Sequence, residues 1–242
     1  GLFKEAETEL LEVIRDFPGA GGAYRLLARV EQRLGKTGHM KLALEQLSAL
    51  EPENADVWCD LGDINYALND WDLATDAYQR ALDLIPTDRR YLARLAYGQL
   101  SAQLFNKIET TRRQLLRDHA DFSISHIVDG HVYKSQGNLE QAAESYARAI
   151  QVDPGQCEAI FHLVELKTPG PGDPFTARIV KLIENGEIVD DEKAHLYFSL
   201  SRIYENAKQF DLAFDHYQSA NQHLQQSMKK KGLGIRSSRC GG

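Results

Sequence analysis

Histidine and acidic side chains are the groups in this 242-residue sequence that could bind a metal ion or transfer protons. His126 and His131 are five positions apart, or about 140 degrees around a helix, so they cannot hold one ion from one helix face. His216 and His223 share a face at a spacing of seven, but no carboxylate or cysteine stands four positions from either. We therefore predict no metal site, no cofactor and no catalytic residue in this chain.

Two other segments have compositions that can accompany catalysis. Residues 190–192 are all acidic, but they precede a helix expected from about residue 193 and complement the positive end of its dipole. The segment 168–174 is rich in proline and glycine, yet it lacks the lysine followed by Ser or Thr of a phosphate-binding loop and follows a helix instead of a strand. We interpret it as a loop whose closing Asp-Pro pair starts a helix over 175–184.

The elements that position these side chains repeat along the chain. Pro18, Pro52, Pro86 and Pro154 are separated by 34, 34 and 68 residues, which is one period and its double. A fixed period of this size predicts a stack of helix pairs. Such a stack binds other molecules through its surface, so function is expected in a groove rather than in an enclosed active site.

The unit 55–88 shows what each repeat contains. Small residues such as Gly62 let two helices approach, and Pro86 ends the second helix because it cannot continue the hydrogen-bond ladder. The unit resembles the tetratricopeptide repeat through Trp58, Leu61, Gly62, Ala74, Tyr78, Ala81 and Pro86. This resemblance implies an all-α, right-handed superhelical solenoid of antiparallel helix pairs.

The remaining units fit the same frame. Gly1 to Phe3 align with the turn inside a repeat, so the first helix of that unit is expected to be missing and the chain looks truncated. We predict one solenoid domain over 1–226: a half repeat (1–20), repeats 21–54, 55–88, 89–122 and 123–156, an irregular unit (157–193) and a last repeat (194–226). Residues 227–242 are basic, without helical period, and are predicted to be a disordered tail.

The segment 196–221 adds a second resemblance. Its aromatic and small residues look like the last repeat before the catalytic domain of bacterial tetratricopeptide-repeat sulfotransferases. In that family a domain with a phosphate-binding loop for the sulfate donor follows, and nothing of that kind occurs in this chain. The resemblance implies an alternative role, as the substrate-recruiting N-terminal region of a larger sulfotransferase whose catalytic domain is missing here.

Composition narrows the environment and the partners. The three cysteines, Cys59, Cys157 and Cys240, are odd in number and scattered, which favours reduced thiols in the cytoplasm. The net charge of -7 argues against a nucleic-acid partner, because such proteins need a basic surface. The sequence indicates neither a signal peptide nor an apolar run long enough for a membrane span, so no membrane partner is expected.

The first helices of the repeats are expected to line the concave groove. The positions not used for helix packing are Arg25, Arg29, Asp56, Asp60, Asp63, Arg90, Arg94, Tyr97, His131 and Lys134. Two basic clusters thus flank an acidic strip. Two interpretations stay open: the arginines only balance the aspartates across neighbouring helices, or the groove binds a charged ligand.

Some tetratricopeptide repeats hold the acidic tail of chaperones in a carboxylate clamp of Lys, Asn and Arg. The matching positions here are Arg25, Arg29, Asp60, Arg90 and Arg94. An anionic Asp60 would repel the carboxylate of such a tail. We therefore predict a non-catalytic scaffold that binds an extended protein or peptide segment with both acidic and basic side chains.

Overall fold

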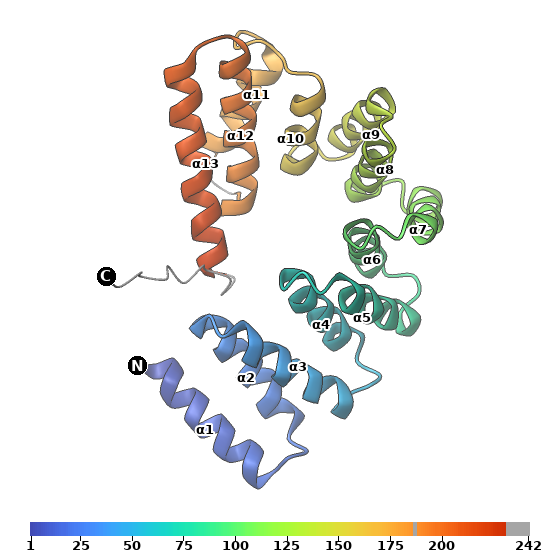
Figure 1. The fold of residues 1–242 in the computed structure, drawn as a ribbon, viewed down its shortest axis with the longest axis vertical. Helices are drawn as coiled ribbons and strands as arrows, with labels where there is room; N and C mark the ends of the chain where they lie inside the picture. The colour runs from blue at the N-terminus through green and yellow to red at the C-terminus, as the bar shows by residue number, and fades with distance from the viewer. Residues whose placement is uncertain (186–187, 231–242) are drawn as a thin grey trace, which may run out of the picture. The chain divides into compact units, whose positions relative to one another are not determined.

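The computed structural model describes residues 1–185 and 188–230, which form thirteen α-helices and no β-strand (Figure 1). The all-α architecture of paired helices predicted from the sequence is confirmed. The helices are α1 (Leu2–Asp16), α2 (Gly21–Leu34), α3 (Thr37–Leu50), α4 (Ala55–Ala67), α5 (Trp71–Leu84), α6 (Arg89–Ser101), α7 (Phe105–Asp118), α8 (Ser123–Ser135), α9 (Leu139–Val152), α10 (Cys157–Leu166), α11 (Pro174–Glu184), α12 (Asp190–Asn206) and α13 (Phe210–Lys230).

The 34-residue period of the sequence is the period of the helices. Five first helices begin 34 residues apart, at Gly21, Ala55, Arg89, Ser123 and Cys157. The second helices of the first four pairs keep the same spacing and begin at Thr37, Trp71, Phe105 and Leu139. The two helices of a pair lie alongside each other in α2–α3, α4–α5 and α8–α9, as Figure 1 shows for α4 and α5.

Two compact units make up this part of the chain, residues 1–98 and residues 99–227. The core of the first is built from apolar side chains of α2 to α5, including the buried Leu47 and Val57. The core of the second joins α8 to α12, with Tyr146, Ile160 and Leu200 among its buried members. Each unit therefore has a continuous core of its own.

Close approach of the two helices in a repeat depends on glycine. A Cβ atom placed on Gly62 would lie 2.4 Å from Cε1 of Tyr78, and one on Gly130 would lie 2.5 Å from Cε1 of Tyr146. Both tyrosine rings are buried against the backbone of the facing helix. The predicted role of Gly62 as a contact point between helices is thus confirmed, and Gly130 has the same role.

The turns between the helices of a pair share one unusual backbone conformation. Gly35, Asn69, Gln103 and Gly137 stand 34 residues apart, and all four have a positive φ, of 68, 63, 56 and 79 degrees. Only glycine adopts this left-handed region without a steric cost, although asparagine tolerates it. The repeat 89–122 therefore makes the same turn with a glutamine at the strained position.

The loop before α11 ends as the sequence predicts. The Asp173 carboxylate accepts a hydrogen bond from the backbone N–H of Phe175 at 2.8 Å, and Pro174 occupies the first helical position. The predicted helix over 175–184 is confirmed. This loop does not shift the repeat frame, since α11 begins one residue later and α12 one residue earlier than the 34-residue period would place them.

The acidic residues 190–192 lie inside a helix rather than before it. The helix expected from about residue 193 begins at Asp190, because Val189 is extended and its N–H donates to Glu192 Oε2 at 3.1 Å. The three carboxylates occupy the first turn of α12. There they complement the helix dipole, as expected.

The two ends of the described chain differ. Helix α1 packs on α2 but buries none of its residues, and Leu2 and Phe3 are 82% and 50% exposed. Helix α13 continues to Lys230, four residues past the predicted end of the last repeat. The rest of the predicted basic tail lies outside the described residues. None of the described helices combines the length and the apolar character needed to cross a membrane.

Candidate functional site

An acidic strip follows one face of α4. Asp56, Asp60 and Asp63 are spaced i, i+4 and i+7, so their carboxylates project to the same side of the helix. Asp56 and Asp60 are exposed, and Asp63 is half-buried. This strip is the centre of the groove predicted in the first unit.

Side chains from α5 and α6 hold the two ends of the acidic strip. The Tyr91 hydroxyl donates to Asp56 Oδ1 at 2.6 Å. Asp63 Oδ1 accepts from the Tyr78 hydroxyl at 2.9 Å and pairs with Arg94. The outer two aspartates are therefore fixed by the helices packed beside α4.

The other predicted arginines do not pair with the acidic strip. Arg25 pairs with Glu51 at 2.5 Å between Nη2 and Oε2. Arg90 binds Asp88, with Nη2 to Oδ2 at 2.7 Å, and the Asp88 carboxylate also accepts from the backbone N–H of Arg90 at 2.8 Å. Arg29 is exposed and makes no hydrogen bond or ion pair with any described residue. Of the four predicted groove arginines, only Arg94 forms an ion pair with an aspartate of the acidic strip.

Asp60 lies at the middle of the strip and is its unpaired member. No hydrogen bond or ion pair to it is formed within the described residues. Desolvation raises the pKa of Asp60, and the charges of Asp63 and Asp56 raise it further, against the opposing effect of Arg94 and Arg25. Within the acidic strip, Asp60 is therefore the carboxylate whose negative charge is offset by neither a hydrogen bond nor an ion pair among the described residues.

The predicted residues of the second unit, His131 and Lys134, belong to a different network. Both lie on α8, opposite α10. His131 Nε2 lies 3.1 Å from Glu158 Oε1, and its Nδ1 lies 2.9 Å from the Tyr146 hydroxyl. Lys134 Nζ donates to Glu165 Oε2 at 2.6 Å.

His162 completes this network, although it was not among the residues predicted from the sequence. Its ring packs edge-on against His131, with centroids 4.7 Å apart, and stacks on Tyr146. His162 Nδ1 lies 2.9 Å from Glu165 Oε2. A signal was present in the sequence, because Glu158 and His162 have i, i+4 spacing on one helix, but His131 joins them only across the boundary between two repeats.

The electrostatic environment of this network is mixed. Burial lowers the pKa of His162, and the nearby His131 and Lys134 add to that effect. Burial works to raise the pKa of Glu165, but hydrogen bonds from Lys134 and His162 outweigh it and the pKa is lowered. Glu165 is thus a carboxylate anchored by two donors.

A second ion cluster joins α1, α2 and α3. Lys36 Nζ binds Glu7 Oε1 at 2.5 Å and lies 3.9 Å from Oε2 of the buried Glu31, while His39 Nδ1 lies 3.4 Å from Glu31 Oε1. Burial and the charge of Glu7 raise the pKa of Glu31. The Lys36 ammonium group already lies against both carboxylates, where a bound cation would otherwise lie.

The predicted site residues are divided between the two units. Eight of them, from Arg25 to Tyr97, belong to residues 1–98, where Tyr97 is half-buried on α6. His131 and Lys134 belong to residues 99–227.

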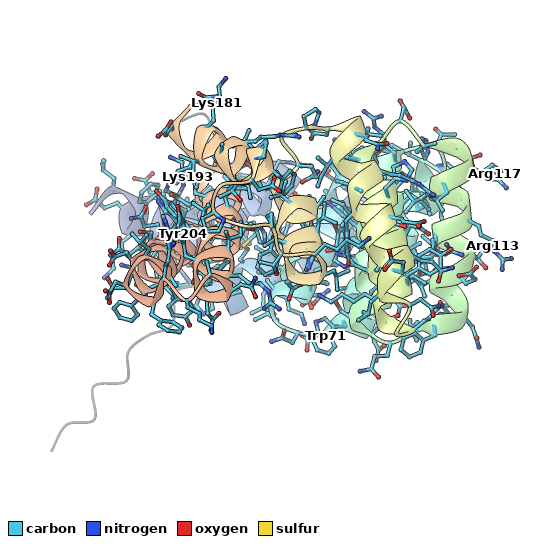
Figure 2. The ribbon with its side chains drawn as sticks, turned by 90° about the horizontal axis from the view of Figure 1, so that it is seen from above. Trp71, Arg113, Arg117, Lys181, Lys193 and Tyr204 are labelled. Carbon is cyan, nitrogen blue, oxygen red and sulfur yellow. The ribbon has the colours of Figure 1, made fainter. Side chains whose placement is uncertain are left out.

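The second helix α7 carries arginines that were not among the predicted groove residues. Figure 2 shows Arg113 and Arg117 of α7 pointing outward. The guanidinium groups of both are well exposed.

Comparison with known proteins identifies the repeats. Family models described as tetratricopeptide repeat match residues 55–88 and 130–156. A tetratricopeptide repeat protein from Parabacteroides merdae has a similar fold, with a TM-score of 0.71 over 96% of this chain and 91% of that one, at 16% identity. The chain has the fold of a tetratricopeptide-repeat solenoid. The matched families describe repeats and no catalytic domain.

Two further matches come from named proteins. The structure of YrrB, described as a tetratricopeptide repeat protein with an unusual peptide-binding site, has a TM-score of 0.51 and 12% identity, with 86% of this chain and 97% of that chain covered. Human DnaJ homolog subfamily C member 7 is 25% identical over 122 residues, or 47% of this chain. The chain spans 25% of the length of that relative. The resemblance to sulfotransferase repeat regions is untested by these matches and stays a prediction.

Proposed function

We propose that this tetratricopeptide scaffold binds an extended segment of a partner protein along the face formed by the first helices α2, α4 and α6. Asp60 would receive a Lys or Arg of that segment, and Arg29 would receive an Asp or Glu. The observation that carries the proposal is the charge state of the face: Asp60 and Arg29 are exposed and lack ion-pair partners among the described residues.

Several features favour a basic side chain beside the acidic strip. Asp56 has a tyrosine hydroxyl rather than a cation as its hydrogen-bond partner. A cleft of about 590 Å³ opens next to it, and its lining includes Glu53 as well as Glu51, which already binds Arg25. A ligand cation entering here would lower the mutual repulsion of the three aspartates, which adds to desolvation in raising the pKa of Asp60.

The remaining predicted groove residues have supporting roles in this proposal. Arg25, Arg90 and Arg94 are each tied to a protein carboxylate, so they shape and neutralise the rim rather than supply free charge. Tyr97, on α6, offers an aromatic edge to the same ligand. His131 and Lys134 would contact a ligand of the second unit, in the network with Glu158 and Glu165.

A charge-reversal series on a peptide array tests the proposal. The full chain and its D60K variant are applied to arrayed peptides in which Lys and Glu positions are scanned through a neutral extended background. Asp76 on α5 is an exposed carboxylate on a second helix, so D76K changes the net charge equally and serves as the control. Circular dichroism establishes that all three proteins are folded.

The expected result is a change in selection, not only in strength. Wild type and D76K should bind the same set of peptides that contain a basic residue, and D60K should no longer bind that set. Binding by wild type should also weaken as salt is added, because exposed charges are screened beyond roughly 8 to 10 Å. If D60K and wild type select the same peptides, the acidic strip is not the ligand site and the proposal fails.

A further inference from the structure

The network around His131 brings metal-binding groups together from two successive repeats. His131 comes from α8, and Glu158 and His162 come from one face of α10. One ligand atom from each of the three residues lies within 4.8 Å of the others. Two imidazoles and a carboxylate are the ligand set of several three-residue zinc sites in proteins.

Both imidazole rings are held by neighbours through the same nitrogen. The Tyr146 hydroxyl is 2.9 Å from Nδ1 of His131, and Glu165 Oε2 is 2.9 Å from Nδ1 of His162. Partners of this kind fix the orientation of a metal-binding histidine and leave its Nε2 for the ion. Glu165 is itself anchored by Lys134, so the outer contacts of the site are complete.

The positions of the three groups suit a small cation. In a tetrahedral site with metal–nitrogen bonds of about 2.0 to 2.1 Å, ligand atoms are roughly 3.3 Å apart. His131 Nε2 and Glu158 Oε1 are already 3.1 Å apart. All three ligand atoms lie within 4.8 Å of one another, so each of the other two distances needs to close by at most about 1.5 Å to reach that spacing.

The burial and the charge of the three side chains are compatible with binding a cation. The side chains of His131 and His162 are 18% and 17% exposed, and that of Glu158 is 29% exposed, so the cluster is sheltered but open to solvent. The Glu158 carboxylate would offset part of the charge of an ion, and the ammonium group of Lys134 is hydrogen-bonded to Glu165. In the cluster of Glu7, Glu31 and His39, by contrast, the Lys36 ammonium already serves as the cation.

We propose that His131, Glu158 and His162 form a binding site for a transition-metal dication of the Zn²⁺ class on the first-helix face of the second unit. Imidazole ligands favour such ions over Mg²⁺ and Ca²⁺, which prefer oxygen ligands. Three protein ligands leave one tetrahedral position open, as in sites that exchange water or bind an outside group. None of its three ligands belongs to the acidic strip of the first unit.

Metal titration of the untagged full chain tests the site. Zn²⁺ affinity is measured by competition with a chromophoric chelator, and Co²⁺ is used as a probe because its visible spectrum reports coordination. The C240S background removes the thiol that lies outside the described residues. One equivalent of Zn²⁺ should bind, and bound Co²⁺ should show the intense visible bands of four-coordination.

Three variants remove one ligand atom each while keeping the neighbouring contact. Asparagine reproduces Nδ1 of histidine but not Nε2, so H131N and H162N retain a partner for Tyr146 or Glu165. E158Q keeps the shape of the side chain and loses its charge. Each should lower Zn²⁺ affinity about tenfold or more, since even outer-shell partners contribute 10- to 100-fold. H39N, in the other cluster, should leave affinity unchanged.

The outcomes separate a site from surface binding and from misfolding. Variants that melt cooperatively by circular dichroism but no longer bind Zn²⁺ tightly support the site. E165Q should weaken binding 10- to 100-fold and leave the Co²⁺ bands in place, as expected for an outer-shell residue. Absence of saturable one-to-one binding in the parent chain, or equal affinity in H162N and H39N, would overturn the proposal.

Discussion

The substitution Gly62→Ala examines the contact on which each repeat depends. The new Cβ would lie 2.4 Å from Cε1 of Tyr78, about 1 Å closer than ordinary carbon contacts. The ring cannot retreat easily, because Tyr78 is 3% exposed and its hydroxyl is bonded to Asp63. Overpacking costs roughly 1 to 3 kcal/mol, and the gain in helix propensity returns about 1 kcal/mol, so we expect a net loss of up to about 2 kcal/mol.

The assay is chemical denaturation followed by circular dichroism, with two controls. A Cβ added to Gly38, on α3, would have no neighbouring atom within 4 Å, so Gly38→Ala should stabilise the chain by up to about 1 kcal/mol. In the background Tyr78→Leu, which removes the ring, the overpacking cost of Gly62→Ala should largely disappear, which corresponds to a coupling energy of roughly 1 to 3 kcal/mol. Equal denaturation midpoints for Gly62→Ala and Gly38→Ala would refute the close helix approach.

Three other predictions concern strained or buried groups. Gln103→Gly should raise the unfolding free energy by roughly 0.5 to 1 kcal/mol, measured by denaturation, because Gln103 has a φ of 56 degrees that glycine adopts freely. Burial raises the pKa of both Cys59 and Cys157 to about 12, so mass spectrometry after treatment with a thiol reagent at neutral pH should find them modified only in unfolded protein. Glu31→Gln should raise the unfolding free energy most at neutral pH, where the buried carboxylate of Glu31 is ionised. The difference from wild type should shrink as pH falls through the raised pKa of Glu31, because the folded wild type then protonates this carboxylate. Denaturation at several pH values measures the difference.

The repeat frame was predictable because it rests on local rules. Proline spacing, small residues at helix contacts and the Asp-Pro pair before α11 each act within a few residues of chain, so one sequence reveals them. The predicted start of α12 was three residues late, although its signal is also local. The first turn of α12 is capped by Glu192 reaching back to the N–H of Val189, and the acidic run was assigned to the preceding loop instead.

The charge pairing of the first unit could not be predicted from the sequence. The sequence shows arginines and aspartates at repeated positions, but the 34-residue period does not tell which acidic residue each arginine pairs with. Glu51, after α3, binds Arg25, and Asp88, before α6, binds Arg90; both acids lie outside the first-helix positions expected to line the groove. The surplus charge at Asp60 follows from these pairings and so becomes visible only in three dimensions.

The histidine network shows how repeats build a site that no single repeat contains. His131 stands at the ninth position of its 34-residue frame, and Glu158 and His162 stand at the second and sixth positions of the next. These positions meet between α8 and α10, where His131 lies 3.1 Å from Glu158 and its ring packs against that of His162. Distance along the sequence is therefore a poor guide to ligand sets in a solenoid. Position within the repeat, compared between neighbours, is the better one.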